Sequence, residues 1–67
     1  MKVIAELDVS DIMRLKLQTG EYNGDPRVDL RMFIKIKGEF KPTKKGINFH
    51  AEWIDKFIEM IKKLEDV

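Results

Sequence analysis

The fold is decided by the stretch Arg27 to Gly46, which reads RVDLRMFIKIKGEFKPTKKG. Its first half alternates apolar and polar side chains, and alternation of period two is the signature of a half-buried β-strand. The side that we expect to face the core carries Val28, Leu30, Met32, Ile34 and Ile36. The other side carries Arg27, Asp29, Arg31, Phe33, Lys35 and Lys37. The sequence therefore predicts a strand with a charged outer face on which Phe33 is the one aromatic ring.

A basic turn follows this strand, with Lys41, Lys44 and Lys45 in the run KPTKKG. Binders of single-stranded nucleic acid combine cations, which track the phosphates, with flat rings on which bases stack. The outer face, with Lys35 and Phe33, and the basic turn supply both. The alternative is a lysine-rich solvated sheet surface whose charge only keeps the protein soluble.

The length and composition predict one small domain over residues 1–67. A chain this short buries only about 60% of its unfolded surface. It has no cysteine, so disulfides cannot stabilise it, and its single histidine makes a zinc site improbable. Regular packing or oligomerisation must therefore supply the missing stability.

Positive charge is concentrated in the middle of the chain. Residues 12–50 carry nine Lys and Arg against four acids, whereas both flanking segments are net acidic. This distribution is expected if one sheet face is a basic footprint. No stretch has the ~18 apolar residues of a membrane span, and the acidic start does not resemble a signal peptide. We expect an intracellular protein, cytoplasmic or at the nucleoid in a prokaryote and nuclear in a eukaryote.

Two more strands are predicted before the central one, over residues 3–9 and 12–19. In the second of them Arg14 and Lys16 point outward, on the side away from the expected core. Ile4 interrupts the alternation of the first, which indicates an edge strand or a surface covered by another part of the protein. These strands would extend the charged face of the central strand, so Arg14 and Lys16 join the predicted nucleic-acid-binding residues.

The turns between the strands are marked by Gly, Asn and Pro. Residues Gly20 to Pro26 predict a turn, with Tyr22 near its tip either folded back onto the sheet or exposed. Gly38-Glu39 predicts a tight reversal, and Pro42 an edge or irregular segment. A short strand at Ile47 to Phe49 would complete an antiparallel meander of four strands.

Residues 51–65 change to a helical period. Apolar side chains recur at intervals of three and four, as on an amphipathic helix. They are Trp53, Ile54, Phe57, Ile58, Ile61 and Leu64. The apolar stripe is wider than one four-stranded sheet would cover, so we expect a twofold homodimer in which Trp53, Phe57, Ile58 and Ile61 meet the partner. The alternative is that the whole stripe is core within one chain.

No catalytic motif is found. The glycines are scattered turn residues, and nothing places Ser10, the only serine, beside His50. Asp25 and Asp29 are expected to neutralise arginines of the same strand rather than to catalyse. We therefore expect neither an enzyme nor a metal or other cofactor.

The run Val28-Asp29-Leu30-Arg31, the turn Lys41 to Ile47 and the Trp-bearing helix resemble the C-terminal domain of transcriptional positive cofactor four and its prokaryotic relatives. The resemblance covers roughly residues 12–64, and KPxxKGI is its most specific part. It implies an α+β fold: a curved four-stranded antiparallel sheet followed by one C-terminal amphipathic helix, in a homodimer whose helices meet at the twofold axis. It also implies single-stranded DNA binding with little sequence preference and, in the eukaryotic member, transcriptional coactivation.

Carried over by position, the resemblance places Tyr22 where the family has a base-stacking phenylalanine. The basic positions that match are Arg14, Arg31, Lys41, Lys44 and Lys45. The family's stacking tryptophan falls at Ile34, and the neighbouring Phe33 could replace it if the backbone bulges there. Asn23 and Asp25 stand where the eukaryotic protein has loop lysines, so this loop has lost charge.

Three functions remain open from the sequence. The first is a dimeric binder of single-stranded DNA or RNA, in transcription regulation or general handling of single strands. The second is a protein-interaction module of the transcription machinery on the same fold. The third is a structural domain without a nucleic-acid partner, which would require Phe33 and Tyr22 to be buried.

Overall fold

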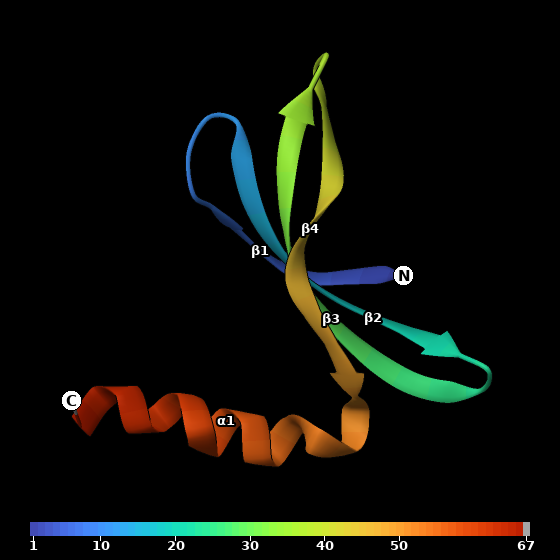
Figure 1. Ribbon diagram of the computed structural model, residues 1–67, viewed down its shortest axis with the longest axis vertical. Helices are drawn as coiled ribbons and strands as arrows, with labels where there is room; N and C mark the ends of the chain where they lie inside the picture. The colour runs from blue at the N-terminus through green and yellow to red at the C-terminus, as the bar shows by residue number, and fades with distance from the viewer. Residues whose placement is uncertain (67) are drawn as a thin grey trace.

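Residues 1–66 are described by the computed structural model, which shows a four-stranded antiparallel sheet followed by one helix (Figure 1). The strands pair in chain order, so the sheet is an open meander, and the predicted α+β class is confirmed. The elements are β1 (Lys2–Asp8), β2 (Met13–Tyr22), β3 (Asp25–Ile36), β4 (Glu39–His50) and α1 (Ile54–Lys62). Short 3-10 turns at Ala51–Trp53 and Lys63–Asp66 flank the helix.

Two-residue turns join the long central strands. Asn23 and Gly24 have φ angles of 52° and 84°, and Lys37 and Gly38 have φ angles of 51° and 83°. Positive φ at both central residues defines the type I′ turn, whose twist matches that of the flanking strands. The predicted seven-residue turn at residues 20–26 was too long, and the second reversal lies one residue earlier than predicted. β2 and β3 stay paired as far as Tyr22 and Asp25, because Gly20 and Pro26 are accommodated within the two strands.

The last strand is irregular but continuous, which corrects the predicted short strand at Ile47 to Phe49. The β3–β4 register shifts between Arg31, which pairs with Gly46, and Phe33, which pairs with Pro42. Pro42 is tolerated because β4 is an edge strand, as predicted. Gly46 is required by close approach: a Cβ there would lie 2.7 Å from the carbonyl oxygen of Leu30.

The register divides the sheet into two faces. Residues directly opposite each other share a face. Arg14 pairs with Phe33 and Lys16 pairs with Arg31, so these four lie on one face. Leu15, which pairs with Met32, lies on the other. The alternation predicted from the sequence is confirmed, and we call the two sides the basic face and the apolar face.

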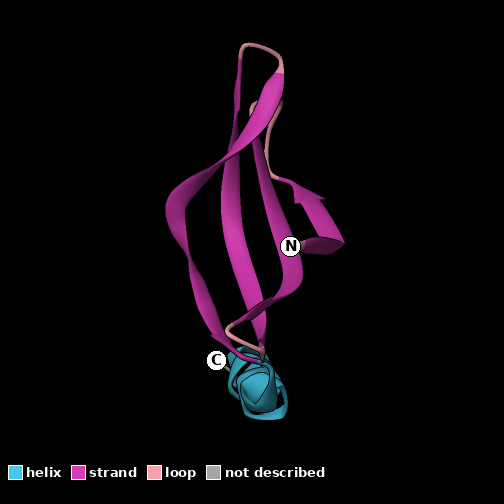
Figure 2. Cartoon of the chain, turned by 90° about the vertical axis from the view of Figure 1, so that its right-hand side faces the viewer, coloured by secondary structure: helices cyan, strands magenta, loops and turns pink. Residues whose placement is uncertain are grey.

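The helix leaves the end of β4 and projects away from the sheet, so the molecule is L-shaped and only 18 Å thick (Figures 1 and 2). It is anchored at its base, where the rings of Phe49 and Phe57 stack with their centroids 5.0 Å apart. Regular α-helix covers residues 54–62, a shorter span than the predicted 51–65. Asp55 in the first turn and Lys62 in the last complement the helix dipole.

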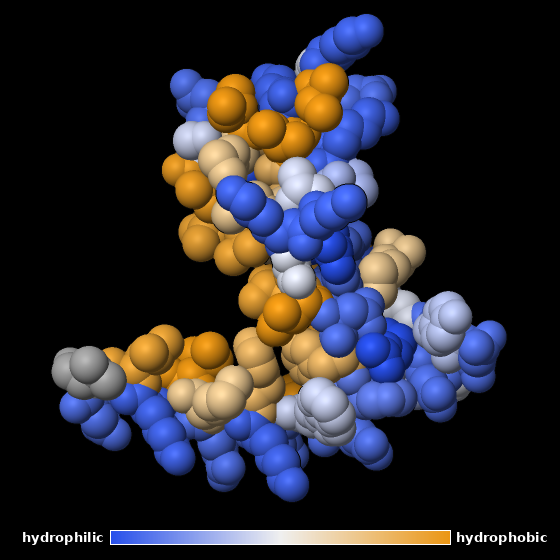
Figure 3. Space-filling view, viewed as in Figure 1, coloured by the Kyte–Doolittle hydropathy of each residue, from blue (hydrophilic) through white to orange (hydrophobic). Residues whose placement is uncertain are grey.

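Little of the apolar surface is buried within the described chain. Only Val28, Phe33 and Phe49 are buried apolar residues in residues 1–66. Figure 3 shows orange, apolar atoms along the inner side of the helix and along the facing side of the sheet, with open space between them. One copy of this chain therefore leaves the usual second layer of a domain missing.

Candidate nucleic-acid interface

Two aromatic rings and four cations meet on the basic face near the β3–β4 turn. β2 supplies Arg14 and Lys16, and β3 supplies Arg31, Phe33 and Lys35. The second ring is Phe40, which pairs with Lys35. The structure thus brings together most of the residues that the sequence predicted for this surface, and we call these six the ring cluster.

Phe33 is not the open stacking ring that the sequence predicted. Its side chain is on the basic face, but the residue is only 8% exposed. The ammonium of Lys16 lies over the ring, 4.5 Å from its centroid, in a cation–π contact. The β3 backbone does not bulge against β2, so Phe33 rather than Ile34 faces this side. Phe33 is a support for Lys16 in this structure, and a base could reach its ring only if Lys16 moved.

Phe40 is the half-buried ring that sequence reasoning missed. The guanidinium carbon of Arg14 lies 4.2 Å from its centroid, and the ammonium of Lys35 lies 6.0 Å from it. Counting outward from the two-residue turn pairs Lys35 with Phe40 and would have placed this ring on the basic face. A ring beside two cations offers a stacking surface next to phosphate partners.

Arg31 and Asp29 are joined by several hydrogen bonds on the basic face. Asp29 is 3% exposed, and Arg31 donates to its carboxylate from Nη2 at 2.9 Å and from Nε. Nη1 of Arg31 donates to the carbonyl oxygen of Thr43 at 2.8 Å. The Arg31 guanidinium holds the pKa of Asp29 below its usual value, against the opposing effect of burial. The expected neutralisation of Arg31 is confirmed, and Arg31 ties the irregular part of β4 to β3.

Acids of β1 neutralise two cations of the ring cluster. Nε of Arg14 donates to Asp8 at 2.7 Å, and the ammonium of Lys16 lies 3.4 Å from Glu6. Glu6 pairs with Lys16 and Asp8 with Arg14 across β1 and β2, so these ion pairs follow from the register. The net positive charge on this part of the face is therefore smaller than the count of cations indicates.

The lysines of the basic turn do not share one face. Lys41 pairs with Ile34, an apolar-face residue, and its ammonium contacts Glu39 at 2.9 Å. Lys44 and Lys45 lie in the bulged part of β4 and are exposed. Within residues 1–66 neither of these two has an acid within ion-pair distance. Lys44 and Lys45 are therefore free to meet a ligand, whereas Lys41 is placed on the wrong side for the ring cluster.

Tyr22 is exposed at the far end of the same face. Its alternation with Lys16 along β2 places it on the basic face, and the residue is 70% exposed. The sequence left open whether Tyr22 is folded back onto the sheet or exposed, and the structure shows that it is exposed. Arg27 lies nearby on β3, and its Nε donates to Asn48 at 2.7 Å, not to the carboxylate of Asp25 that was expected to neutralise it. This end of the face thus presents a ring and a cation apart from the ring cluster.

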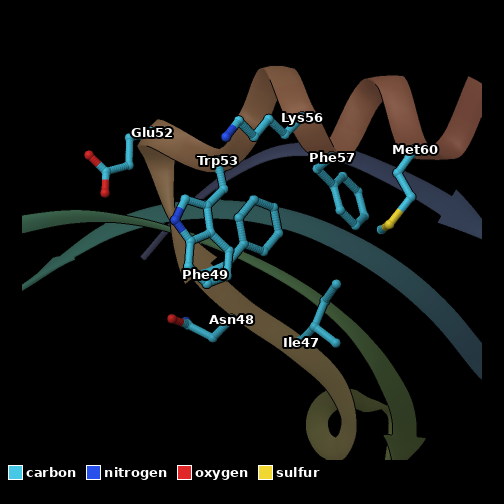
Figure 4. A pocket seen from close by; sticks show the side chains of 8 residues that line it. All are labelled: Ile47, Asn48, Phe49, Glu52, Trp53, Lys56, Phe57 and Met60. Atoms are coloured by element: carbon cyan, nitrogen blue, oxygen red, sulfur yellow. The ribbon is translucent and has the colours of Figure 1, made fainter.

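Two of the four residues predicted to meet a partner chain, Trp53 and Phe57, line a hollow between α1 and β4, whereas Ile58 and Ile61 do not. The hollow measures about 800 Å³ and is lined largely by apolar side chains (Figure 4). Trp53, Phe57 and Met60 point toward it from the helical segment, and Ile47 does so from β4. Trp53 is 55% exposed, and Ile58 and Ile61 are also exposed.

The described residues give no sign of two other kinds of site. No group of three or more His, Asp or Glu side chains in residues 1–66 is placed to hold a metal ion. No helix of that part of the chain is long and apolar enough to cross a membrane.

The fold and the basic face together define a class of small α+β domain. In this class a curved antiparallel sheet carries cations and rings on one face and is followed by an exposed amphipathic helix. Residues 12–60 match the family Transcriptional Coactivator p15 (PC4), so the chain belongs to that family. The predicted family, including its prokaryotic type, is confirmed. No curated protein sequence matches the chain.

Solved structures agree with this family. A PC4 homologue from Burkholderia pseudomallei has a TM-score of 0.88 at 28% identity, over 96% of this chain and 88% of the other. The bacteriophage T5 homologue of the eukaryotic coactivator has a TM-score of 0.77 at 21% identity, over 94% and 74% of the two chains. A MoSub1–ssDNA complex has a TM-score of 0.60 at 23% identity, over 91% and 71%. The matches to the bacteriophage T5 and MoSub1 structures, at 21% and 23% identity, show that the fold is shared.

Proposed function

We propose that this protein binds single-stranded DNA with little sequence preference through its basic face. The observation that carries the proposal is Phe40, a half-buried ring flanked by Arg14 at 4.2 Å and by Lys35, on the same face as the exposed ring of Tyr22. Rings accept any base, and cations neutralise phosphates and release counterions. A duplex keeps its bases stacked inside and would bind less well. MoSub1, one of the structural matches, was solved in complex with single-stranded DNA, which supports the proposal.

We place the free phosphate contacts at Lys35, Lys44 and Lys45, with Arg14 and Lys16 as partly neutralised ones. Arg31 acts chiefly by holding the backbone beneath Lys44 and Lys45. Phe33 supports Lys16 from below. Lys41 stays in the proposed set only as a distant contribution to the field, because it lies on the apolar face.

The working form in this proposal is a homodimer. Trp53 is 55%, Ile58 45% and Ile61 46% exposed, and residues 1–66 leave open the apolar hollow that Trp53 and Phe57 line. A second copy offers a matching apolar stripe by symmetry. The dimer would present two basic faces. We propose an intracellular role in transcription regulation or in general handling of single-stranded DNA.

The test compares single- and double-stranded oligonucleotides of equal length by fluorescence anisotropy at low and moderate salt. We expect the single strand to bind more tightly, with log affinity falling by ~0.7 per tenfold increase in salt for each phosphate contacted. Lys45→Ala should weaken binding to all sequences about equally and reduce the salt slope. Lys62→Ala, on the polar side of the helix, is the matched control. Absence of binding at low salt would contradict the proposal.

A second candidate is a protein-interaction module of the transcription machinery. It is favoured by the ion pairs of Glu6 and Asp8 with Lys16 and Arg14, which leave less charge for phosphates. The same titration separates the two candidates, because this one predicts no binding to the oligonucleotide at low salt.

A further inference from the structure

A small open cleft lies at the end of the basic face nearest the β2–β3 turn. It measures about 490 Å³ and is lined by Met1, Glu21, Tyr22, Arg27 and Asn48. The register places Arg27 opposite Gly20, six residues along β2 from the Arg14–Phe33 pair. At ~3.3 Å per residue Gly20 lies about 20 Å from Arg14 and about 13 Å from Lys16, the nearest member of the ring cluster on β2. The cleft is therefore a separate site on the same face.

The cleft has flat, apolar flanks. At Gly20, which has no side chain, Met1 takes the space: a Cβ there would lie 3.1 Å from Cγ of Met1. The ring of Tyr22 is the next side chain on this face of β2 and is 70% exposed. Aromatic rings and polarizable thioethers are good contacts for the face of a planar heterocycle.

Arg27 presents an oriented pair of donors to this cleft. Its Nε donates to Oδ1 of Asn48 at 2.7 Å, and the amide of Asn48 in turn donates to the buried Asp29 at 3.4 Å. Within residues 1–66 no carboxylate lies within ion-pair distance of Arg27, and no hydrogen bond uses its terminal nitrogens. The side chain is thus fixed through Nε, while Nη1 and Nη2 remain available.

A guanidinium that offers two parallel donors matches two acceptors that lie side by side on a base edge. Guanine has such a pair in O6 and N7, and cytosine has one in O2 and N3 on its pairing edge, whereas adenine presents a donor beside N7 and thymine has no two adjacent acceptors. In a single strand both edges are exposed. Guanine has the larger ring to stack on Tyr22, so the chemistry of the cleft favours guanine over cytosine and both over adenine and thymine.

We propose that this cleft is a nucleobase subsite with a preference for guanine, in which Tyr22 stacks on the base and Arg27 donates to O6 and N7. The proposal rests on single-strand binding by the basic face and adds a base preference within it. Asn48 is a positioning residue, because it acts through Arg27.

The test uses short thymidine oligonucleotides that carry one central guanine, 7-deazaguanine or adenine. 7-Deazaguanine keeps the ring and O6 but lacks N7. We expect the wild-type protein to bind the guanine oligonucleotide about fivefold more tightly than the 7-deazaguanine one. Arg27→Lys keeps the charge but loses the paired donors. It should therefore bind the guanine and 7-deazaguanine oligonucleotides equally, while its affinity for the thymidine backbone of these oligonucleotides is retained. Asn48→Ala should reduce the preference.

Lys44→Ala is the control, since it should weaken all three oligonucleotides alike and keep their ratio. Equal wild-type affinity for guanine and 7-deazaguanine, with salt-dependent binding intact, would overturn the subsite and leave the proposed function standing. Failure of every oligonucleotide to bind at low salt would overturn both. Loss of the preference in Lys44→Ala but not in Arg27→Lys would place base reading elsewhere.

Discussion

The guanidinium of Arg31 joins the carboxylate of Asp29, at 2.9 Å, to the carbonyl oxygen of Thr43, at 2.8 Å. One side chain thus links a buried acid of β3 to the bulged part of β4. The hydroxyl of Thr43 completes the link by donating to the carbonyl oxygen of Met32 at 2.7 Å. A polar network therefore links the basic turn to β3.

Asp29→Asn should destabilise the protein by about 2–3 kcal/mol at neutral pH, because it leaves Arg31 partly buried without its charge partner. Hydrogen bonds from Arg31 lower the pKa of Asp29 below the usual 3.8. The stabilisation is therefore fully present above that value and is lost as the pH falls through the lower pKa of the folded state. Urea denaturation at several pH values measures this.

The gap between wild type and Asp29→Asn should shrink as the pH falls below about 4. Asp25→Asn, which replaces an exposed acid at the β2–β3 turn, is the matched control and should differ little from wild type. A gap that stays constant down to low pH would mean that the Asp29 charge is not what stabilises the fold.

Replacing Glu6 and Asp8 by Gln and Asn should increase affinity for single-stranded DNA, by about two- to fivefold at low salt, and steepen the salt dependence. The reason is that Lys16 and Arg14 would no longer be neutralised within the protein. Exposed ion pairs contribute only about 0–1 kcal/mol, so stability should change little. Anisotropy titrations measure the affinity, and Glu59→Gln on the helix serves as the control. Unchanged affinity in the double variant would show that β1 does not compete with phosphate.

Ile61→Glu should convert the proposed homodimer into monomers. Ile61 is 46% exposed in the single chain, and placing an unpaired carboxylate in an apolar interface is costly. Sedimentation velocity measures the assembly state, and Lys62→Glu adds the same side chain on the polar side of the helix. If Ile61→Glu sediments like wild type, the helix stripe is not the dimer contact.

Gly46→Ala should destabilise the protein by about 1–3 kcal/mol, since the new methyl group meets rigid backbone. Its Cβ would lie 2.7 Å from the carbonyl oxygen of Leu30 and 2.9 Å from Cα of Arg31. Urea denaturation compares this variant with Lys44→Ala, an exposed change in the same bulge. Equal stability of the two variants would show that β4 can move away from β3 at little cost.

The sequence predicted the strands well because one strong signal, the alternation from Arg27 to Lys37, determines both the β3 pairing and the side on which each residue lies. It misplaced the turns because Gly20 and Pro26 can also lie within strands, and propensity does not reveal when pairing overrides them. It missed the continuity of β4 because a bulge interrupts the alternation there.

The candidate site was predicted at the level of a face but not of individual side chains. Phe33 looked open because alternation says nothing about a neighbouring Lys16 that covers it. The ion pair of Arg31 with Asp29 was expected, but its bond to Thr43 was not, because that bond depends on the β4 bulge. Phe40 and the Arg27–Asn48 pair depend on cross-strand register, which becomes readable only once the two-residue turns are known.

A single copy of this chain has no second layer packed on the apolar face of its sheet, so it cannot complete a core by itself. If the second layer comes from another copy, folding and assembly become one bimolecular process, and the stability of the fold rises with the amount of protein present. The number of molecules in the cell would then decide how many are folded at all. At low protein concentration, newly made chains would stay unfolded and exposed to proteases until they meet a partner.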